Sequence, residues 1–245
     1  MACYYIRKYF TIFLMLAIPA ASASCQNQTD SVENENEWKS KAETMIEEQL
    51  IARGIKDEKV LESIKNVPRH KFVPENMRPH AYSDGPLPIG YDQTISQPYI
   101  VALMTSELGL SGDETVLEIG TGSGYQAAVL AEIVDTVYSI EIVEGLAERA
   151  ADLLSELGYE NVVTKHGDGY KGWKEHAPFD RIILTAAPEK IPGQLIEQLK
   201  PGGIMVLPVG KNQQVLQKIT KTMDNKLEQE TITGVRFVPM VHPKR

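Results

Sequence analysis

A glycine-rich turn between an expected strand and an expected helix is the segment most suited to binding a small molecule. It reads Gly120-Thr121-Gly122-Ser123-Gly124 and follows the apolar run 115–119. Glycine lets backbone amides at the start of a helix come close to a ligand. The spacing Gly-x-Gly-x-Gly, with Tyr125 next, departs from the Gly-x-Gly-x-x-Gly of dinucleotide-binding turns. A nicotinamide cofactor is therefore disfavoured.

Three acidic residues stand at the ends of three expected strands near this turn. Glu118 comes just before it, where a carboxylate repels a pyrophosphate but attracts an ammonium group such as that of S-adenosylmethionine. Glu141 follows the first glycine by 21 residues, close to the spacing at which an acid accepts hydrogen bonds from ribose hydroxyls. Asp168, beside Gly169, can accept from an adenine amino group. Each acid alone is more simply a solvated loop carboxylate, but the three together favour a nucleoside cofactor.

The elements that must position these residues alternate in type after residue 98. The pattern predicts strands over 115–119, 136–141, 161–165, 181–186 and 204–209, and helices over 99–108, 125–133, 143–157 and 192–199. This alternation indicates an α/β fold, a Rossmann-like, doubly wound and mostly parallel sheet. Strand-like runs over 215–220, 226–232 and 235–238 lack helices between them, which predicts an antiparallel edge.

Residues 38–98 are expected to add helices and a proline loop to this sheet. Helical spacing over 38–53 ends at Gly54, and Asp57 can cap a second helix that stops before Pro68. Six prolines then fall between residues 68 and 98, interleaved with large apolar residues. Since a linker would lack those apolar residues, the segment is predicted to be an ordered loop on the core.

Composition excludes several classes of protein. The chain has 245 residues, of which 42% are hydrophobic and 24% charged, as expected for one globular domain. Its net charge of −8 and its lack of a basic block disfavour nucleic acid as a partner. Both cysteines, Cys3 and Cys25, precede the expected domain, and the five histidines include no i, i+4 pair. No metal site is therefore expected.

The amino terminus has the pattern of a signal peptide, assigned to residues 1–24. Arg7 and Lys8 precede an apolar run over 9–18 and then small residues. This run is shorter than the ~20 residues of a membrane-spanning helix. The pattern predicts export to the periplasm. The alternative is a mispredicted start and a cytoplasmic protein.

Residues 25–37 are polar and acidic, as expected of a solvated tether before a single domain over 38–245. Cys25 after Ala23-Ser24 resembles a lipoprotein box, although Ser22 stands where leucine is usual. A lipid on Cys25 would be the tether to a membrane.

Together these residues resemble a class I S-adenosylmethionine-dependent methyltransferase, and more narrowly the protein-L-isoaspartate O-methyltransferase family. The narrow resemblance rests on Pro86-Leu87-Pro88-Ile89-Gly90, on Thr94-Ile95-Ser96-Gln97-Pro98 and on 116–131, and extends over roughly residues 45–240. Asp92 stands where the family usually has glycine, and typical cytosolic members have no leader.

The resemblance implies transfer of a methyl group from S-adenosylmethionine to the free α-carboxylate of L-isoaspartyl residues in damaged proteins or peptides, which starts their repair. It implies Ser96 as the active-site residue, whose hydroxyl holds the carboxylate in line. The residues expected to bind the cofactor are Ile95, Glu118, Gly120, Thr121, Gly122, Gly124, Glu141, Asp168 and Gly169. The structural alternative for Ser96 is an N-cap of the helix that Pro98 begins.

Other functions stay open at this stage. A small-molecule methyltransferase would share the cofactor fold, and an exported protein could bind the cofactor without turnover. A nucleic-acid methyltransferase is disfavoured because Thr185-Ala186-Ala187-Pro188 replaces the Asp/Asn-Pro-Pro-Tyr signature. A peptide is expected to lie between the loop 82–97 and the segment 235–239. The protein is expected to be a monomer.

Overall fold

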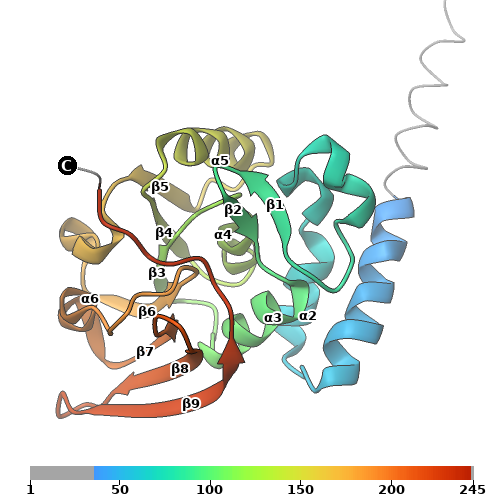
Figure 1. The fold of residues 1–245 in the computed structure, drawn as a ribbon. Coiled ribbons are helices and arrows are strands. Elements are labelled where there is room, and N and C mark those ends of the chain that lie inside the picture. The colour runs from blue at the N-terminus through green and yellow to red at the C-terminus, as the bar shows by residue number, and fades with distance from the viewer. Residues whose placement is uncertain (1–35, 244–245) are drawn as a thin grey trace, which may run out of the picture. The chain divides into compact units, whose positions relative to one another are not determined.

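A seven-stranded sheet carries the glycine turn near its centre in the computed structural model, which describes residues 36–243 (Figure 1). The strand order is β5-β4-β3-β6-β7-β8-β9. The strands up to β7 run parallel, and β8 and β9 are antiparallel. Their bounds are β3 Thr115–Ile119, β4 Thr136–Glu141, β5 Val162–His166, β6 Phe179–Leu184, β7 Leu199–Val209, β8 Gln214–Lys221 and β9 Leu227–Val235. The predicted α/β fold with an antiparallel edge is confirmed.

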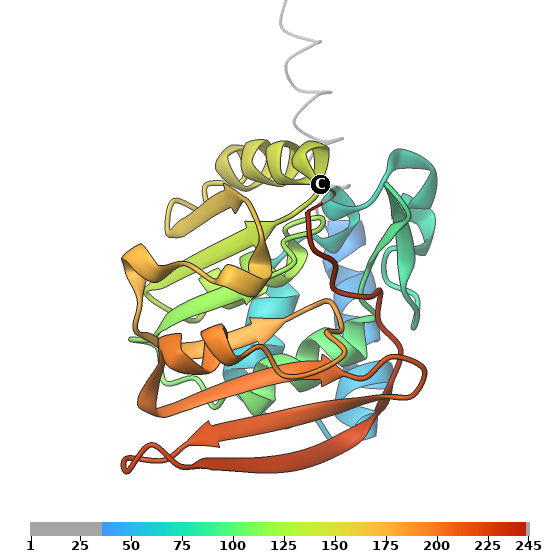
Figure 2. The same ribbon diagram turned by 60° about the vertical axis from the view of Figure 1, so that its left-hand side comes forward.

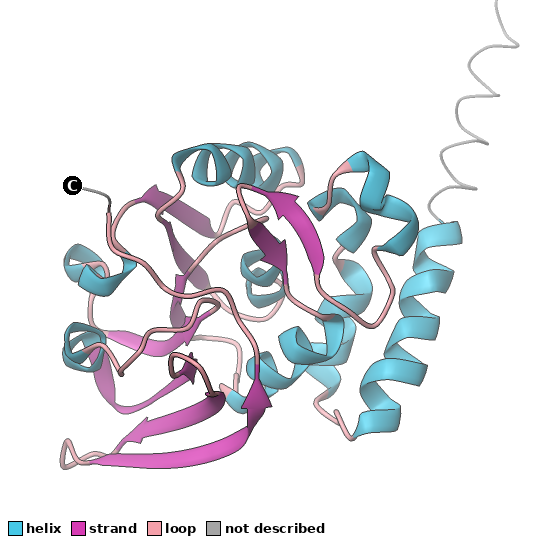
Figure 3. Cartoon of the chain, in the orientation of Figure 1, coloured by secondary structure: helices cyan, strands magenta, loops and turns pink. Residues whose placement is uncertain are grey.

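Helices cover both faces of this sheet (Figure 3). They are α2 Glu58–Asn66, α3 Pro98–Glu107, α4 Tyr125–Ala131, α5 Glu144–Glu156 and α6 Gly193–Gln198. Alternate residues of β3 enter different cores: Val116 packs in the cluster of α2 to α5, and Leu117 in that of α6. Since β4 and β5 lie on one side of β3 and β6 on the other, the chain reverses its winding at β3, where ligands bind in such sheets.

The amino-terminal helices follow the sequence prediction closely. Residues 38–45 are helical and continue through the π-helical turn Ile46–Leu50 and the 3₁₀ turn Ile51–Arg53 to Gly54, whose φ is 97°. The Asp57 side chain caps α2 by accepting from the amides of Lys59 (3.1 Å) and Val60 (3.3 Å). The capping residues were therefore predicted correctly.

The proline-rich segment is ordered, as predicted, but it also contains a hairpin that the sequence analysis missed. Strands β1 (Leu87–Gly90) and β2 (Gln93–Ile95) pair outside the main sheet, after the 3₁₀ turns Arg69–Phe72 and Glu75–His80. Ile89 and Ile95 are buried, which anchors the hairpin to the core. Proline in such a short strand removes ladder donors and hides the alternation that identifies strands.

The prediction of a separate strand over 235–238 is wrong. One strand, β9, ends at Val235, and the chain then runs back across the sheet edge (Figure 2). There Val238 accepts from the Ala187 amide (2.9 Å), and the Met240 amide donates to the Ala187 carbonyl (2.8 Å). The apolar spacing over 235–238 reflects this contact rather than sheet pairing.

The predicted leader and residues 25–35 of the predicted tether lie outside the described residues. Residues 36 and 37 are helical. Among residues 36–243, no helix is long and apolar enough to span a membrane.

The tip of the β1–β2 hairpin contains an avoidable strain. Tyr91 and Asp92 have φ values of 54° and 57°, as in the two-residue turns that join the strands of a hairpin. We expect Asp92→Gly to raise the free energy of unfolding by up to about 1 kcal/mol, since glycine adopts this conformation without steric cost. Urea unfolding measures the effect.

Asn225→Gly in the turn between β8 and β9, where φ is 62°, is the matched control. Asparagine is the residue that most often stands in for glycine in the left-handed region, so the control should gain less. An Asp92→Gly variant less stable than the parent would contradict the assignment of strain to this position.

Candidate active site

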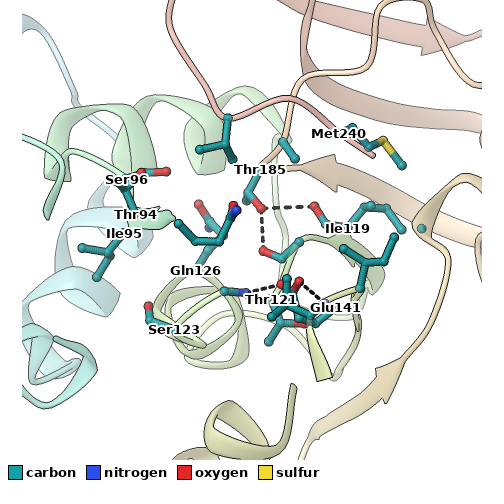
Figure 4. Close-up of a pocket in the computed structure, with 18 of the residues that line it drawn as sticks. Thr94, Ile95, Ser96, Ile119, Thr121, Ser123, Gln126, Glu141, Thr185 and Met240 are labelled. Carbon is teal, nitrogen blue, oxygen red and sulfur yellow. Dashed lines mark hydrogen bonds between the residues drawn. The ribbon is translucent and has the colours of Figure 1, made fainter. Parts of the chain in front are cut away.

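A cavity of about 310 Å³ opens at the carboxyl ends of β3, β4 and β6, where the winding of the sheet reverses (Figure 4). The glycine turn and β4 form one side of it, and the hairpin strand β2 forms the other. The segment after β9 closes it. Of the predicted site residues, those that line the cavity are Ile95, Ser96, Gly120, Thr121, Gly122, Glu141 and Gly169.

The glycine turn is held tightly against the ends of the neighbouring strands. The Gly120 amide donates to the Ile140 carbonyl (2.8 Å), and the Thr185 hydroxyl donates to the Gly120 carbonyl (2.5 Å). Gly120 has a φ of 100°, and a Cβ there would overlap the Thr185 hydroxyl. The first glycine of the turn is therefore required by both its backbone angle and its surroundings.

Glu141, the last residue of β4, presents a fixed carboxylate to the cavity. One oxygen accepts from the Gly122 amide (2.8 Å) and the other from the Val143 amide (2.9 Å). These two backbone bonds orient the carboxylate, and each oxygen keeps a lone pair for a ligand hydroxyl. The geometry suits the predicted recognition of ribose hydroxyls.

Glu118 lies beneath the turn and does not line the cavity. Its carboxylate accepts from the Ser139 hydroxyl, which is also 2.6 Å from the Thr121 hydroxyl on the cavity wall. Its other oxygen has no partner among the described residues. Burial raises the pKa of Glu118 to about 8. Direct contact between Glu118 and a cofactor ammonium stays a prediction.

Two further predicted residues stand outside the cavity wall. Asp168 accepts from the Tyr170 amide (3.0 Å) and lies 3.8 Å from the His242 ring, whereas the neighbouring Gly169 lines the cavity. A Cβ on Gly169 would overlap Ile119, so glycine is needed there. Gly124, with φ of 90°, starts α4 behind the cavity. The predicted contacts of Asp168 and Gly124 with a cofactor stay predictions.

Ser96 follows strand β2 and is not the N-cap of α3. The N-cap is Gln97, and no side-chain hydrogen bond caps that helix. The alternative role considered for Ser96 is therefore wrong. Among the described residues its hydroxyl has no hydrogen-bond partner, and it is free to bind a ligand in the cavity.

A second and larger hollow, a groove of about 1060 Å³, begins where the cavity ends. The two share Thr94, Ser96, Thr185, Val238 and Pro239. The groove runs between the segment around Pro86 to Ile100 and the end of β9. Ser96 thus stands at the junction of an enclosed cavity and an open groove.

Several lining residues were missed by the sequence analysis. Gln126 lines the cavity and donates to the Thr105 hydroxyl (2.9 Å), and Met240 lies on the opposite wall (Figure 4). Gln126 stands two residues beyond the glycine turn, in the first turn of α4, and this position was a usable signal. Met240 offered none, because it enters the site through the return of the chain after β9. Among residues 36–243 there is no cluster of His, Cys, Asp and Glu able to hold a metal ion.

A glycine turn after the first parallel strand, a carboxylate closing the next and a cavity at the reversal of winding make this fold that of a class I S-adenosylmethionine-dependent methyltransferase. The model of the protein-L-isoaspartate(D-aspartate) O-methyltransferase family matches residues 40–245. The chain belongs to this family.

Individual relatives agree with that membership. The protein-L-isoaspartate O-methyltransferase of Opitutus terrae is 58% identical over 204 residues, which are 82% of this chain and 87% of that protein. That of Geobacter metallireducens is 56% identical over 80% of this chain and 92% of its own length. A solved structure of an enzyme of this name has a TM-score of 0.74 at 30% identity, covering 82% of this chain and 66% of its own. A Plasmodium falciparum structure, described as a complex with S-adenosyl-L-homocysteine, has a TM-score of 0.71 at 26% identity, covering 83% and 98%.

The buried carboxyl of Glu118 predicts a pH-dependent stability. Its pKa of about 8 exceeds that of an unfolded glutamate, near 4.5, so the folded state holds a proton that the unfolded state has lost between these values. Stability must therefore fall as pH rises from about 4.5 to 8. Glu118→Gln removes this dependence. We expect the variant to gain about 3 kcal/mol relative to the parent between pH 5 and pH 8.

Urea unfolding of both proteins at the two pH values measures this difference. All other titrating groups are common to the pair and cancel. A difference that stays constant across the range would show that Glu118 ionises normally in the folded protein.

Proposed function

We propose that the cavity and the groove carry out the reaction for which the family is named. The chain transfers a methyl group from S-adenosylmethionine to the free α-carboxylate of L-isoaspartyl residues in proteins and peptides, the first step of their repair. The observation that carries this proposal is the position of Ser96, which lines both hollows. A cofactor in the cavity and a peptide in the groove would meet beside its hydroxyl.

The cavity residues fit S-adenosylmethionine in three respects. The Glu141 carboxylate, held by two amides, can accept both ribose hydroxyls. Gly169 keeps the wall free of a side chain next to Ile119, leaving room for a flat ring. The Glu118 carboxyl lies behind the cavity wall and is linked through the Ser139 hydroxyl to Thr121, so it would attract a cofactor ammonium bound beside Thr121. Bound there, the cofactor supplies an electrophilic sulfonium methyl group.

The chemistry explains why the site needs no general base. A carboxylate with a pKa near 4 is ionised at neutral pH and is already nucleophilic. The protein must therefore hold this carboxylate in line and exclude water, and alignment is worth up to about 7 to 11 kcal/mol. The Ser96 hydroxyl, free of other partners, donates to one carboxylate oxygen and leaves the second to attack. The hairpin β1–β2 and the segment 238–241 cover the reacting atoms.

The test is methyl transfer from labelled S-adenosylmethionine to an isoaspartyl peptide, beside the same peptide with normal aspartate, using protein without residues 1–24. We expect base-labile label on the isoaspartyl peptide alone. Ser96→Ala should lower kcat about 10- to 100-fold, the value of one hydrogen bond to a charged group, and change the Kd of S-adenosylhomocysteine less than about twofold. Ser106→Ala, on α3 outside the cavity, is the matched control.

The other outcomes separate the rival functions. Label on neither peptide, with cofactor binding intact, would favour a small-molecule acceptor or binding without turnover. Unchanged turnover in Ser96→Ala would remove this hydroxyl from the reaction while leaving the activity in place.

We further propose that the chain is exported as a monomer that does not bind nucleic acid. Support comes from the leader pattern over 1–24, the polar tether and the net charge of −8. Cys25 would be the site of a lipid tether.

Cell fractionation followed by amino-terminal sequencing of the mature chain tests the export and the cleavage of the leader. We expect a protein without residues 1–24 in the envelope fraction, since the apolar run is too short to anchor the chain. Full-length protein confined to the cytosol would overturn the export proposal.

A further inference from the structure

A buried arginine lies directly behind the proposed catalytic serine. Arg69, at the start of the 3₁₀ turn Arg69–Phe72, is 0% exposed. Its Nε donates to the Ala81 carbonyl and its Nη2 to the Ser96 carbonyl, both at 2.7 Å. These acceptors are 12 and 27 residues away along the chain. One guanidinium therefore ties together the two ends of the stretch 81–96, which contains the hairpin.

The same guanidinium also touches the cofactor side of the site. Its Cζ lies 4.7 Å from the ring centre of Tyr125, which is buried, lines the cavity and begins α4 directly after the glycine turn. Phe72 packs edge-on against that ring at 5.5 Å. Arg69 thus joins the strand end that carries Ser96 to the helix that follows the glycine turn.

This arrangement is energetically expensive. Burial without a carboxylate partner lowers the pKa of Arg69, and its Nη1 has no hydrogen-bond partner among the described residues. An apolar side chain could fill the same space without the desolvation cost of a cation. A planar guanidinium can donate to two carbonyls and lie against an aromatic ring at the same time. A lysine ammonium cannot reproduce all of these contacts. The hydrogen bond to the Ser96 carbonyl offers a functional reason for burying a cation despite its desolvation cost.

We propose that Arg69 is a positioning residue for methyl transfer, which fixes the Ser96 backbone relative to the helix after the glycine turn and thereby aims the Ser96 hydroxyl at the acceptor carboxylate. The inference rests on the proposed role of Ser96. It assigns to Arg69 no contact with substrate or cofactor, and Arg69 does not line the cavity.

Arg69→Lys tests this, with Arg181→Lys as the matched control. Arg181 likewise donates to backbone carbonyls, those of Leu108 (2.6 Å), Asp180 (2.9 Å) and Gly109 (3.0 Å), but it does not line the cavity. The readouts are kcat on an isoaspartyl peptide, the Kd of S-adenosylhomocysteine and the Tm. We expect Arg69→Lys to lower kcat about 10- to 100-fold, as for a misplaced reacting group, with less than about a threefold change in Kd. Arg181→Lys should keep its kcat even where its Tm falls.

A double-mutant cycle with Ser96→Ala shows whether Arg69 acts through the serine. If it does, Arg69→Lys should lower kcat by less than about twofold further in the Ser96→Ala background. Independent, multiplying effects would overturn the proposal. So would a parallel loss of kcat and of S-adenosylhomocysteine binding, including by failure to fold, because Arg69 would then be only structural.

The outcomes also separate this inference from the proposed function on which it rests. A lowered kcat in Ser96→Ala together with the parent's kcat in Arg69→Lys would overturn the positioning role alone and leave the serine in the reaction. A Ser96→Ala variant with the parent's kcat would instead remove the serine, and the positioning role with it. Activity of the parent on the isoaspartyl peptide is the baseline for both.

Discussion

The attachment of the glycine turn to the end of strand β4 is the interaction on which the rest of the site depends. The Gly120 and Gly122 amides bond to consecutive positions of that strand, the Ile140 carbonyl and the Glu141 carboxylate. These bonds bring the turn, the start of α4 and the acid into one wall. Because the turn needs positive φ and has Thr185 pressed against it, a side chain at Gly120 would separate the wall from β6 as well.

The acceptor side is built differently. The hairpin β1–β2 lies outside the main sheet and is held by buried apolar residues and by single side chains reaching to its backbone. Arg149 of α5 donates to the Ile89 carbonyl (2.6 Å), and Arg69 holds the Ser96 carbonyl. Side chains rather than a ladder thus join the hairpin to the domain, and they place it over the cavity while leaving the main sheet complete without it.

The sequence predicted what local chemistry dictates. Strands β3 and β4 were placed to the residue, since apolar periodicity and capping glycines act over a few positions. Asp57 was identified as a cap for the same reason. Glu141 was found through its spacing from Gly120, which reflects the length of the one helix between β3 and β4. Each of these features depends on neighbours close in the chain.

What escaped prediction depends on residues far apart in sequence. The hairpin was hidden by prolines, and the strand expected over 235–238 turned out to be a crossing segment bonded to Ala187. The same limit applies to Glu118. Its place near the end of β3 was predicted correctly, but its burial under the turn was not visible from the sequence. Arg69 was passed over because its partners lie 12 and 27 residues away. Such residues become recognisable only once the fold brings their partners together.

The electrostatics of the site follow from a reaction that cancels charge. A carboxylate and a sulfonium react to give a neutral ester and a neutral thioether, so surroundings that stabilise separated charges oppose the step. Glu118, with a pKa raised to about 8, is largely protonated at neutral pH when no cation is near, and adds no second carboxylate to that of Glu141. An ammonium bound close to the Thr121 network would lower that pKa and draw out the proton. In the proposed complex the acid would thus ionise beside the cofactor's ammonium and away from the methyl group. Arg69, behind Ser96, donates to two backbone carbonyls and does not line the cavity, so its proposed role is to orient Ser96 and not to contact the attacking carboxylate.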